Sequence, residues 1–178
     1  MNIFVTDQCP VLSAVALPDK YSVKMPLETC QMVSVIFSKW YYDWGYIPKK
    51  DGLPYSTEKG AFRNHPCTQW AAKSHENLAW LIRHGFALCN EYRHRYGKDH
   101  ACMKGLEVAE NIFATKSGKE ISIHKNVVEF TRAMPDFLKY DTSIDTFEAY
   151  KKYIATKEWV KTNYLRIPQR RPEWLDKY

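Results

Sequence analysis

Apolar side chains recur every three or four residues along most of the chain, which is the spacing of one face of an α-helix. The strongest repeat begins at Pro66 and continues to Tyr96. A second helix is predicted from Pro26 to about Tyr41, because a proline in the first turn loses no needed N–H group. Its predicted core stripe is Leu27, Cys30, Ser34, Phe37 and Tyr41.

Shorter helices are predicted over residues 11–17, 101–113 and 145–159, with a short apolar stretch at 121–123. Residues 43–64 hold three glycines and two prolines among polar residues, which predicts a long loop. Gly85 indicates a kink or a close helix crossing inside the strongest repeat. The tail from Arg170 to Trp174 is predicted to be extended. These elements together predict a mainly α fold, a single-domain helical bundle with long loops.

The length of 178 residues fits one domain over residues 1–178. Hydrophobic residues make up 45% and aromatic residues 15% of the chain, so most of it is expected to fold. The five cysteines are irregularly spaced and form no C-x-x-C pair, which indicates reduced thiols and a cytoplasmic protein. Charged residues interrupt every apolar stretch well before the roughly 18 residues that a membrane helix needs, so no membrane association is expected.

The net charge of +6 is unevenly distributed. The segment 151–178 contains eight Lys or Arg against Glu158, Glu173 and Asp176, a local balance of 8 − 3 = +5. Clustered cations between Tyr and Trp residues suit nucleic-acid phosphates, because binding releases condensed counterions. A solvated basic surface explains the same charge, and composition alone does not separate these two interpretations.

Several classes of site are disfavoured by the motifs. Five of the six histidines lie between His65 and His100, but no H-E-x-x-H or C-x-x-C motif accompanies them, so no metal site is predicted. The chain also lacks the G-x-x-x-x-G-K-[ST], G-x-G-x-x-G and G-x-S-x-G patterns. Nucleotide hydrolysis by a P-loop and serine hydrolysis are therefore disfavoured, and no cofactor is expected.

The segment from Asp19 to Glu28 carries the candidate chemistry, because it places the amines of Lys20 and Lys24 near the Glu28 carboxylate. An amine can attack the C1′ atom of a sugar to form a Schiff base, and a carboxylate can stabilise the developing positive charge or move protons. This pairing suits cleavage of an N-glycosidic bond. A structural role is the alternative, since Glu28 would be the third residue of the predicted helix, where a carboxylate favours the helix dipole.

Residues 17–31 resemble a segment of the phage pyrimidine-dimer DNA glycosylase/AP lyase family, the T4-type endonuclease V. The family's leucine, aspartate and catalytic glutamate correspond to Leu17, Asp19 and Glu28. The end of the chain, Arg171-Pro172-Glu173-Trp174, is similar to the family's Arg-Pro-x-Trp, which lies close to bound DNA. The long predicted helix matches the glycosylase/AP lyase family through Leu78, Trp80, Leu81, Glu91, Arg95 and Gly97. The chain also resembles a group of phage-encoded proteins.

The chain departs from the family pattern around this glutamate. The family's histidine is Tyr21 here, and its flanking arginines are Leu27 and Gln31. The family's nucleophile is the amine of a threonine exposed by removal of the first methionine, whereas residue 2 is Asn2, which is too large for routine removal of Met1. The amine of Met1, of Lys24 or of Lys20 then serves as nucleophile, or Glu28 activates water without a lyase step.

Candidate substrate-binding residues lie outside this segment as well. Arg63 and His65 precede the strongest helical repeat, where they face a phosphate or the active site, unless His65 only caps the helix. The run Trp40, Tyr41, Tyr42 and Trp44 can stack on an extrahelical base, whereas Trp70 and Trp80 are expected in the core. The stretch from Arg93 to Arg95 indicates a solvated face, with Glu91 pairing to Arg95. The full predicted substrate-binding set is Tyr21, Trp44, Arg63, His65, Arg170, Arg171 and Trp174.

The sequence-based hypothesis is an N-glycosylase acting on DNA or a nucleotide, with Glu28 as its essential carboxylate. Two rival hypotheses remain. One is a non-catalytic nucleic-acid-binding accessory protein of a phage, and the other is an interaction protein that inhibits a host factor. The sequence identifies no protein partner.

Overall fold

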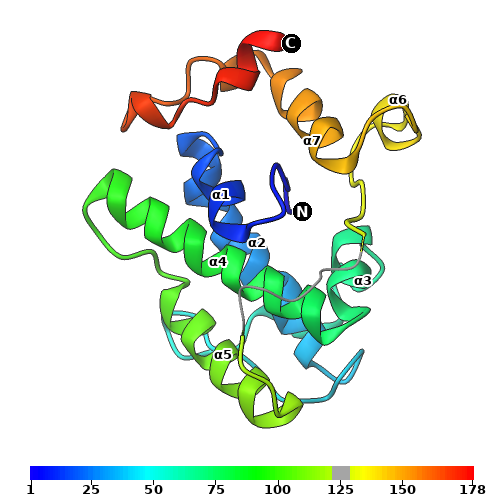
Figure 1. Ribbon diagram of the computed structural model, residues 1–178. Coiled ribbons are helices and arrows are strands. Elements are labelled where there is room, and N and C mark those ends of the chain that lie inside the picture. Colours follow the sequence, from blue (N-terminus) through cyan, green and yellow to red (C-terminus); the bar gives the residue numbers. More distant parts are fainter. Residues whose placement is uncertain (122–128) are drawn as a thin grey trace.

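The computed structural model describes residues 1–121 and 129–178, and within these ranges it contains helices and no strands (Figure 1). The mainly α prediction is confirmed. A single isolated bridge joins Pro48 to Pro54. The α-helices are α1 (Pro10–Val15), α2 (Asp19–Phe37), α3 (Pro66–Ala72), α4 (His75–Tyr96), α5 (Met103–Ser117), α6 (Asp136–Lys139) and α7 (Thr146–Ala155); short 3₁₀ turns cover Ser56–Lys59, Glu158–Val160, Pro168–Arg170 and Glu173–Lys177.

Helix α2 lies at the centre of the molecule, packed against α3, α4 and α5, and α1 packs on α4 (Figure 1). Most of its 19 residues are buried, and solvent reaches it mainly along the stripe Lys20, Val23, Lys24 and Leu27. The predicted core stripe is therefore correct for Cys30, Ser34 and Phe37 and wrong for Leu27, which is exposed. It is also wrong for Tyr41, because α2 ends at Phe37 rather than at Tyr41. Gly85 marks a close crossing, because a Cβ atom there would lie 2.8 Å from Thr29 and 3.0 Å from Leu106.

The predicted start of this helix at Pro26 is wrong, because α2 begins seven residues earlier, at Asp19, and Pro26 lies inside it. The first N–H groups of α2 find their acceptors far away in sequence. Asp19 N donates to the carbonyl of Asn163 at 2.8 Å, and Lys20 N donates to the Asn163 side chain at 2.8 Å. A helix start that is capped by a residue more than 140 positions away leaves no local cap signal in the sequence.

The strongest repeat, predicted as one helix from Pro66 to Tyr96, is two helices separated at Lys73-Ser74. Ser74 ends the continuity because its hydroxyl accepts from Asn77 N at 3.1 Å, the usual N-cap arrangement. His65 caps α3, as one of the two interpretations expected, since its Nδ1 accepts from Cys67 N at 3.2 Å. Trp70 and Trp80 are buried, as predicted.

The remaining elements follow the predictions with shifted ends. The long loop 43–64 is present with one 3₁₀ turn, and the helix predicted over 145–159 ends at Ala155. The tail predicted as extended instead forms the two 3₁₀ turns Pro168–Arg170 and Glu173–Lys177. Residues 122 and 123 of the predicted apolar stretch lie outside the described residues. All five cysteines are free thiols.

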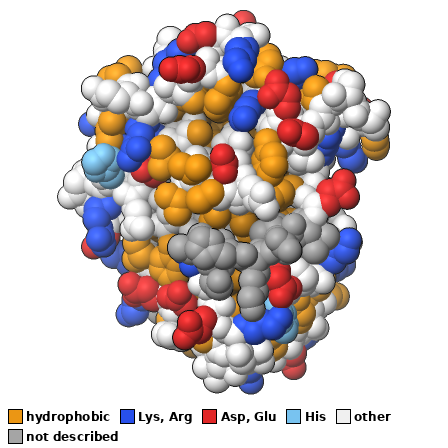
Figure 2. All heavy atoms as spheres, in the orientation of Figure 1, with side chains coloured by type: hydrophobic (Ala, Val, Ile, Leu, Met, Phe, Trp, Pro, Cys, Tyr) orange, Lys and Arg blue, Asp and Glu red, His pale blue; other side chains and the backbone are white. Residues whose placement is uncertain are grey.

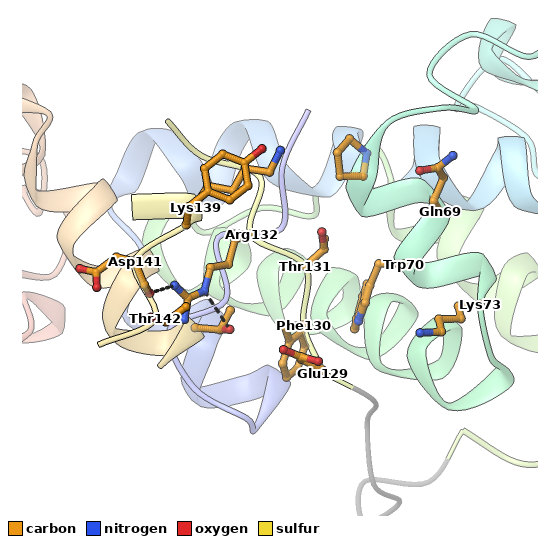
Figure 3. Close-up of a pocket in the computed structure, with 13 residues that line it drawn as sticks. Gln69, Trp70, Lys73, Glu129, Phe130, Thr131, Arg132, Lys139, Asp141 and Thr142 are labelled. Atoms are coloured by element: carbon orange, nitrogen blue, oxygen red, sulfur yellow. Dashed lines mark hydrogen bonds between the residues drawn. The ribbon is translucent and has the colours of Figure 1, made fainter. Parts of the chain in front are cut away.

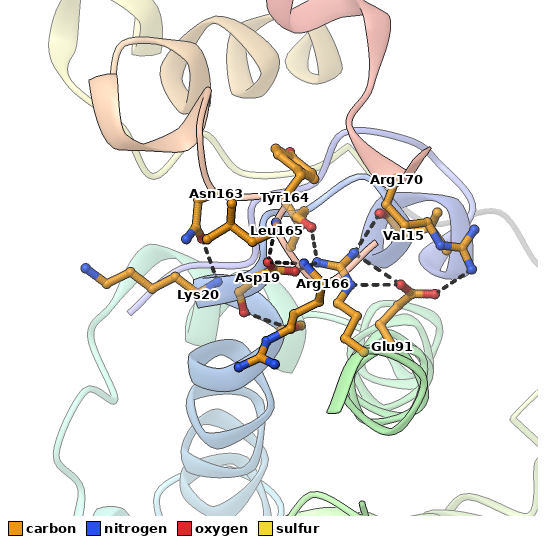
Figure 4. Close-up of polar contacts among 12 residues, drawn as sticks. Val15, Asp19, Lys20, Glu91, Asn163, Tyr164, Leu165, Arg166 and Arg170 are labelled. Carbon is orange, nitrogen blue, oxygen red and sulfur yellow. Dashed lines mark hydrogen bonds and ion pairs between the residues drawn. The ribbon is translucent and has the colours of Figure 1, made fainter. Parts of the chain in front are cut away.

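A buried ion network holds the C-terminal segment to the helical core (Figure 4). The Arg95 guanidinium contacts Asp19 at 3.3 Å and Glu91 at 3.1 Å, and it donates to the carbonyls of Val15 and Leu17. Asp19 also accepts from the backbone of Leu165 and Arg166. The predicted Glu91–Arg95 pair is confirmed, but the solvated face is wrong for Arg95, because the core closes over its side chain.

His84 should make folding sensitive to acid. It is fully buried against Trp80, and burial lowers the pKa of His84 to about 3. Below about pH 6.5 the His84 imidazole takes up a proton in the unfolded chain but not in the folded chain. The stability that depends on neutral His84 is therefore fully present above that pH and is lost as the pH falls toward 3. This residue alone should remove about 3 kcal/mol at pH 4.

Urea unfolding of the natural chain and of His84→Phe at pH 7 and pH 4 measures this contribution. The difference in the free energy of unfolding between pH 7 and pH 4 should be smaller in the variant, even if the substitution itself destabilises the fold at pH 7. An equal loss in both proteins would show that other groups govern the acid sensitivity.

Candidate active site

The Glu28 carboxylate lies between two amines. Its Oε1 atom is 3.0 Å from Lys24 Nζ, one helical turn earlier on α2, and its Oε2 atom is 3.8 Å from the Met1 amine. The backbone N–H of Asn2 also donates to Oε2 at 2.8 Å. Only 8% of the Glu28 side chain is exposed, so these contacts hold a buried carboxylate in one orientation.

The position of Glu28 changes the balance between its two sequence-based interpretations. Because α2 starts at Asp19, Glu28 is the tenth residue of the helix rather than the third. A carboxylate in mid-helix cannot cap the N-terminal N–H groups of its own helix. The capping role is therefore wrong. The buried Glu28 carboxylate is instead held by the two amines and by the backbone N–H of Asn2.

The first residues form a tight turn over Glu28. The Asn2 side-chain carbonyl accepts from the backbone of Ile3 at 2.7 Å and of Phe4 at 3.0 Å, and its amide donates to the carbonyl of Ala133 at 2.7 Å. Phe4 takes a left-handed φ of 44° in this turn. The Met1 side chain is 1% exposed although the whole residue is only partly buried, so the exposed part of Met1 is its main chain, which carries the amine.

Aromatic and polar groups surround this turn. Tyr21 stacks on Phe4 with ring centroids 4.3 Å apart, and burial together with the charges of Tyr153 and Glu28 raises the pKa of Tyr21. The Thr68 hydroxyl contacts the Met1 sulfur at 3.8 Å. Burial and the nearby terminal amine lower the pKa of His65, against the opposing effect of Glu28. Tyr21 and His65 are thus brought together with Glu28 and Met1.

Two other predicted site residues, Lys20 and Trp44, make contacts with other aromatic side chains. Lys20 is exposed and lies over the Trp159 ring at 4.8 Å. Trp44 packs among Phe37, Tyr42 and His75. The sequence predicted that both side chains lie near the substrate. In the structure, Lys20 contacts Trp159, and Trp44 contacts other aromatic rings.

The C-terminal arginines are occupied within the chain. Arg170 pairs with Glu91 at 3.1 Å, and Arg171 contacts both carboxylate oxygens of Asp176, at 2.8 and 2.5 Å. Trp174 is partly buried against the core. On the face shown in Figure 2, acidic and basic side chains alternate around the C-terminal segment and do not separate into a single positive patch. Phosphate binding by these arginines would have to displace a carboxylate.

A cavity of about 590 Å³ opens between α3 and the segment 129–146 (Figure 3). Trp70 and Phe130 stack at its base, with ring centroids 5.0 Å apart. Arg132 lines the cavity, and it fixes one wall by donating to the carbonyls of Leu138, Asp141 and Ile144. The cavity is close to the N-terminal turn, because Asn2 bonds to Ala133 directly after this wall.

This arrangement was only partly accessible from the sequence. The contribution of Ala133 and the turn made by Asn2 were missed. Asparagine near a chain start is compatible with such a turn, because its side chain often accepts from the next backbone N–H groups. The carbonyl of Ala133 carries no sequence signal.

In the described part of the chain, no group of His, Cys, Asp and Glu is arranged to hold a metal ion.

A scan against protein-family models matches residues 1–104 to the pyrimidine dimer DNA glycosylase family. The match covers more than half of the chain and includes Met1, Tyr21, Lys24 and Glu28. The chain belongs to this family. The family implies DNA as the substrate. No curated protein and no solved structure matches the chain.

The match to the glycosylase family ends before the segment that contacts the N-terminal turn and the start of α2. Residues 129–178 supply Ala133, the cavity wall and the contacts to Asp19, all beyond residue 104. The matched portion therefore carries the charged groups around Glu28, and the remaining portion contacts the N-terminal turn and Asp19.

Among the described residues, no helix is both long and apolar enough to cross a membrane.

Proposed function

We propose that the chain is an N-glycosylase with AP-lyase activity on DNA that contains pyrimidine dimers, with Glu28 as its essential carboxylate. The observation that carries this proposal is the contact of two amines with opposite oxygens of one buried carboxylate, within the segment matched to the family. The family implies the glycosylase step. The amines extend the proposal to the lyase step.

The chemistry requires an amine, a proton acceptor and a leaving base. The amine attacks C1′ of the damaged nucleotide, and the C1′–N bond breaks with its electron pair going to the pyrimidine. Glu28 then accepts a proton from the amine and returns it to O4′ as the C1′–O4′ bond breaks, so that the sugar ring opens and a Schiff base forms. Removal of a C2′ proton expels the 3′ phosphate, and water releases the amine.

We assign the attacking amine to Met1 rather than to Lys24. The Met1 side chain is anchored in the core while its main chain is accessible, so its amine has a fixed position at the surface. Lys24 is 59% exposed and lies at the other carboxylate oxygen. Its ammonium group there helps to hold the Glu28 carboxylate in one orientation.

Borohydride trapping tests both steps. A duplex oligonucleotide with a single thymine dimer should be cut at the dimer, and borohydride should reduce the Schiff base to a stable protein–DNA adduct. Peptide mapping should place the adduct on Met1. Lys24→Ala should still form it, whereas an uncleaved N-terminal extension should abolish it.

Two results would contradict the proposal in different ways. An adduct on Lys24 or Lys20 would move the nucleophile and leave the glycosylase step intact. Absence of both an adduct and an alkali-labile site at the dimer would remove the enzymatic function altogether. The assay scores glycosyl-bond cleavage through alkali lability, because the cyclobutane ring keeps the released base attached to its neighbour.

A further inference from the structure

The segment from Thr57 to His65 runs beside α2 and reaches the candidate active site. At one end, the Thr57 hydroxyl donates to the carbonyl of Gln31 at 3.0 Å, one turn after Glu28. At the other end, His65 caps α3, whose Thr68 contacts Met1. The residues between these two ends therefore lie next to the surface through which DNA would approach Glu28.

Two aromatic side chains and an arginine are exposed together in this segment and at the end of α2. We call Trp40, Phe62 and Arg63 the aromatic tip. Trp40 is 43% and Phe62 50% exposed, and the Arg63 guanidinium lies over the Trp40 ring at 4.4 Å. The core does not use these surfaces, since the neighbouring Trp44 is the residue that packs inward.

The aromatic tip is held rigidly. Arg63 donates to the carbonyl of Gly60 at 3.0 Å, and the carbonyl of Arg63 accepts from the Tyr41 hydroxyl at 2.5 Å. Gly60 has a φ of 102° and the Trp40 indole lies directly against it, so no side chain fits there. Phe62 has a left-handed φ of 64°, which is uncommon for a bulky residue and is maintained by these contacts.

Positive charge surrounds the aromatic tip. Lys39 and Lys59 are exposed, and Lys39 Nζ lies 5.9 Å from the Trp40 ring centroid. With Arg63 they give three cations, against Glu58 in the same turn. Flat aromatic faces among cations fit a polyanion with stacked rings better than an apolar protein surface, because the cations meet phosphates while the rings meet bases.

We propose that the aromatic tip contacts the DNA duplex beside the damaged nucleotide, with Phe62 stacking on a base that the lesion or the enzyme has unstacked. Arg63 and the neighbouring lysines contact the flanking phosphates. This inference rests on the proposed function for its substrate, and it adds a recognition surface on the side of α2 where the family's arginines are replaced by Leu27 and Gln31.

The test uses binding without cleavage. A duplex with a thymine dimer and an adjacent 2-aminopurine is titrated with the Glu28→Gln protein, and 2-aminopurine fluorescence should rise as its base is unstacked. Phe62→Ala in the same background should abolish the rise and weaken binding about 5- to 150-fold, the range expected for one base–aromatic contact. Phe62→Trp should retain tight binding, because it keeps an aromatic face.

Tyr46→Ala is the matched control. Tyr46 is 53% exposed, and nearby Pro48 lies against Gly105 on α5. The substitution therefore removes an exposed aromatic side chain that is not part of the aromatic tip. The inference is overturned if Phe62→Ala binds and fluoresces as Tyr46→Ala does. Equal urea unfolding midpoints show that both variants fold. Absence of dimer cleavage by the natural chain would refute the proposed function separately, since the binding difference needs no turnover.

Discussion

Replacement of Glu28 by glutamine should lower the rate of glycosyl-bond cleavage at a thymine dimer on the order of 10³-fold, the middle of the range for a positioned acid–base group. Glutamine has nearly the same shape, and its side-chain carbonyl can still accept from Asn2 N. It cannot take a proton from the Met1 amine or carry the negative charge that faces Met1 and Lys24. Single-turnover cleavage measured by alkali-induced strand breaks gives the rate.

Glu76→Gln is the control for this variant. Glu76 is also a glutamate paired with a lysine, Lys119 at 2.9 Å, but it is partly exposed on α4 and away from the N-terminal turn. Its substitution should leave the cleavage rate unchanged. Binding of dimer DNA by Glu28→Gln should stay within a few-fold of the natural chain, because the exposed cations are retained. A Glu28→Gln protein that cleaves within three-fold of the natural rate would exclude Glu28 as the essential carboxylate.

Arg95→Met should lower the free energy of unfolding by about 3–5 kcal/mol. The guanidinium is fully buried, and its removal leaves the carboxylates of Asp19 and Glu91 without a buried cation between them. Two backbone carbonyls, of Val15 and Leu17, lose their donor as well. Such a loss is a large part of the roughly 5–15 kcal/mol that stabilises a typical domain. Urea unfolding at pH 7 measures it.

Arg93→Met on the same helix separates burial from charge. Arg93 pairs with Asp99 at the surface, where exposed ion pairs contribute less than about 1 kcal/mol. The triple substitution of Asp19→Asn, Glu91→Gln and Arg95→Met should recover part of the lost stability, because no buried charge is left unpaired. Similar losses for the Arg93 and Arg95 variants would mean that the buried network does not hold the C-terminal segment.

The contact between the candidate residues Lys24 and Glu28 was easier to predict from the sequence than the ends of the helices. Glu28 was chosen as a candidate from its type and from the resemblance, and Lys24 from its proximity in sequence. The i,i+4 contact between Lys24 and Glu28 follows from any helix that spans both residues. The predicted start at Pro26 excluded such a helix, because proline is usual in a first turn and unusual inside.

The interpretation of the C-terminal charge failed to foresee intramolecular pairing. Eight cations in 28 residues suggest a free positive surface, and the count is correct. Arg170 and Arg171 nevertheless pair with Glu91 and Asp176. Composition counts charges but does not say which carboxylates lie within 4 Å, so the excess available to a phosphate is smaller than the sequence indicates.

The sequence by itself determined that the chain folds into helices, that its long loop follows α2, and that one glutamate near two lysines is the candidate for N-glycosidic chemistry. These properties depend on spacing within a few residues, which a sequence displays directly. The tertiary structure alone decided that the Met1 amine faces Glu28, that Asn163 caps α2, and that Phe62 and Trp40 share one exposed surface. Each of these joins residues separated by 22 to more than 140 positions, and contacts over such separations arise from packing, which has no period along the chain.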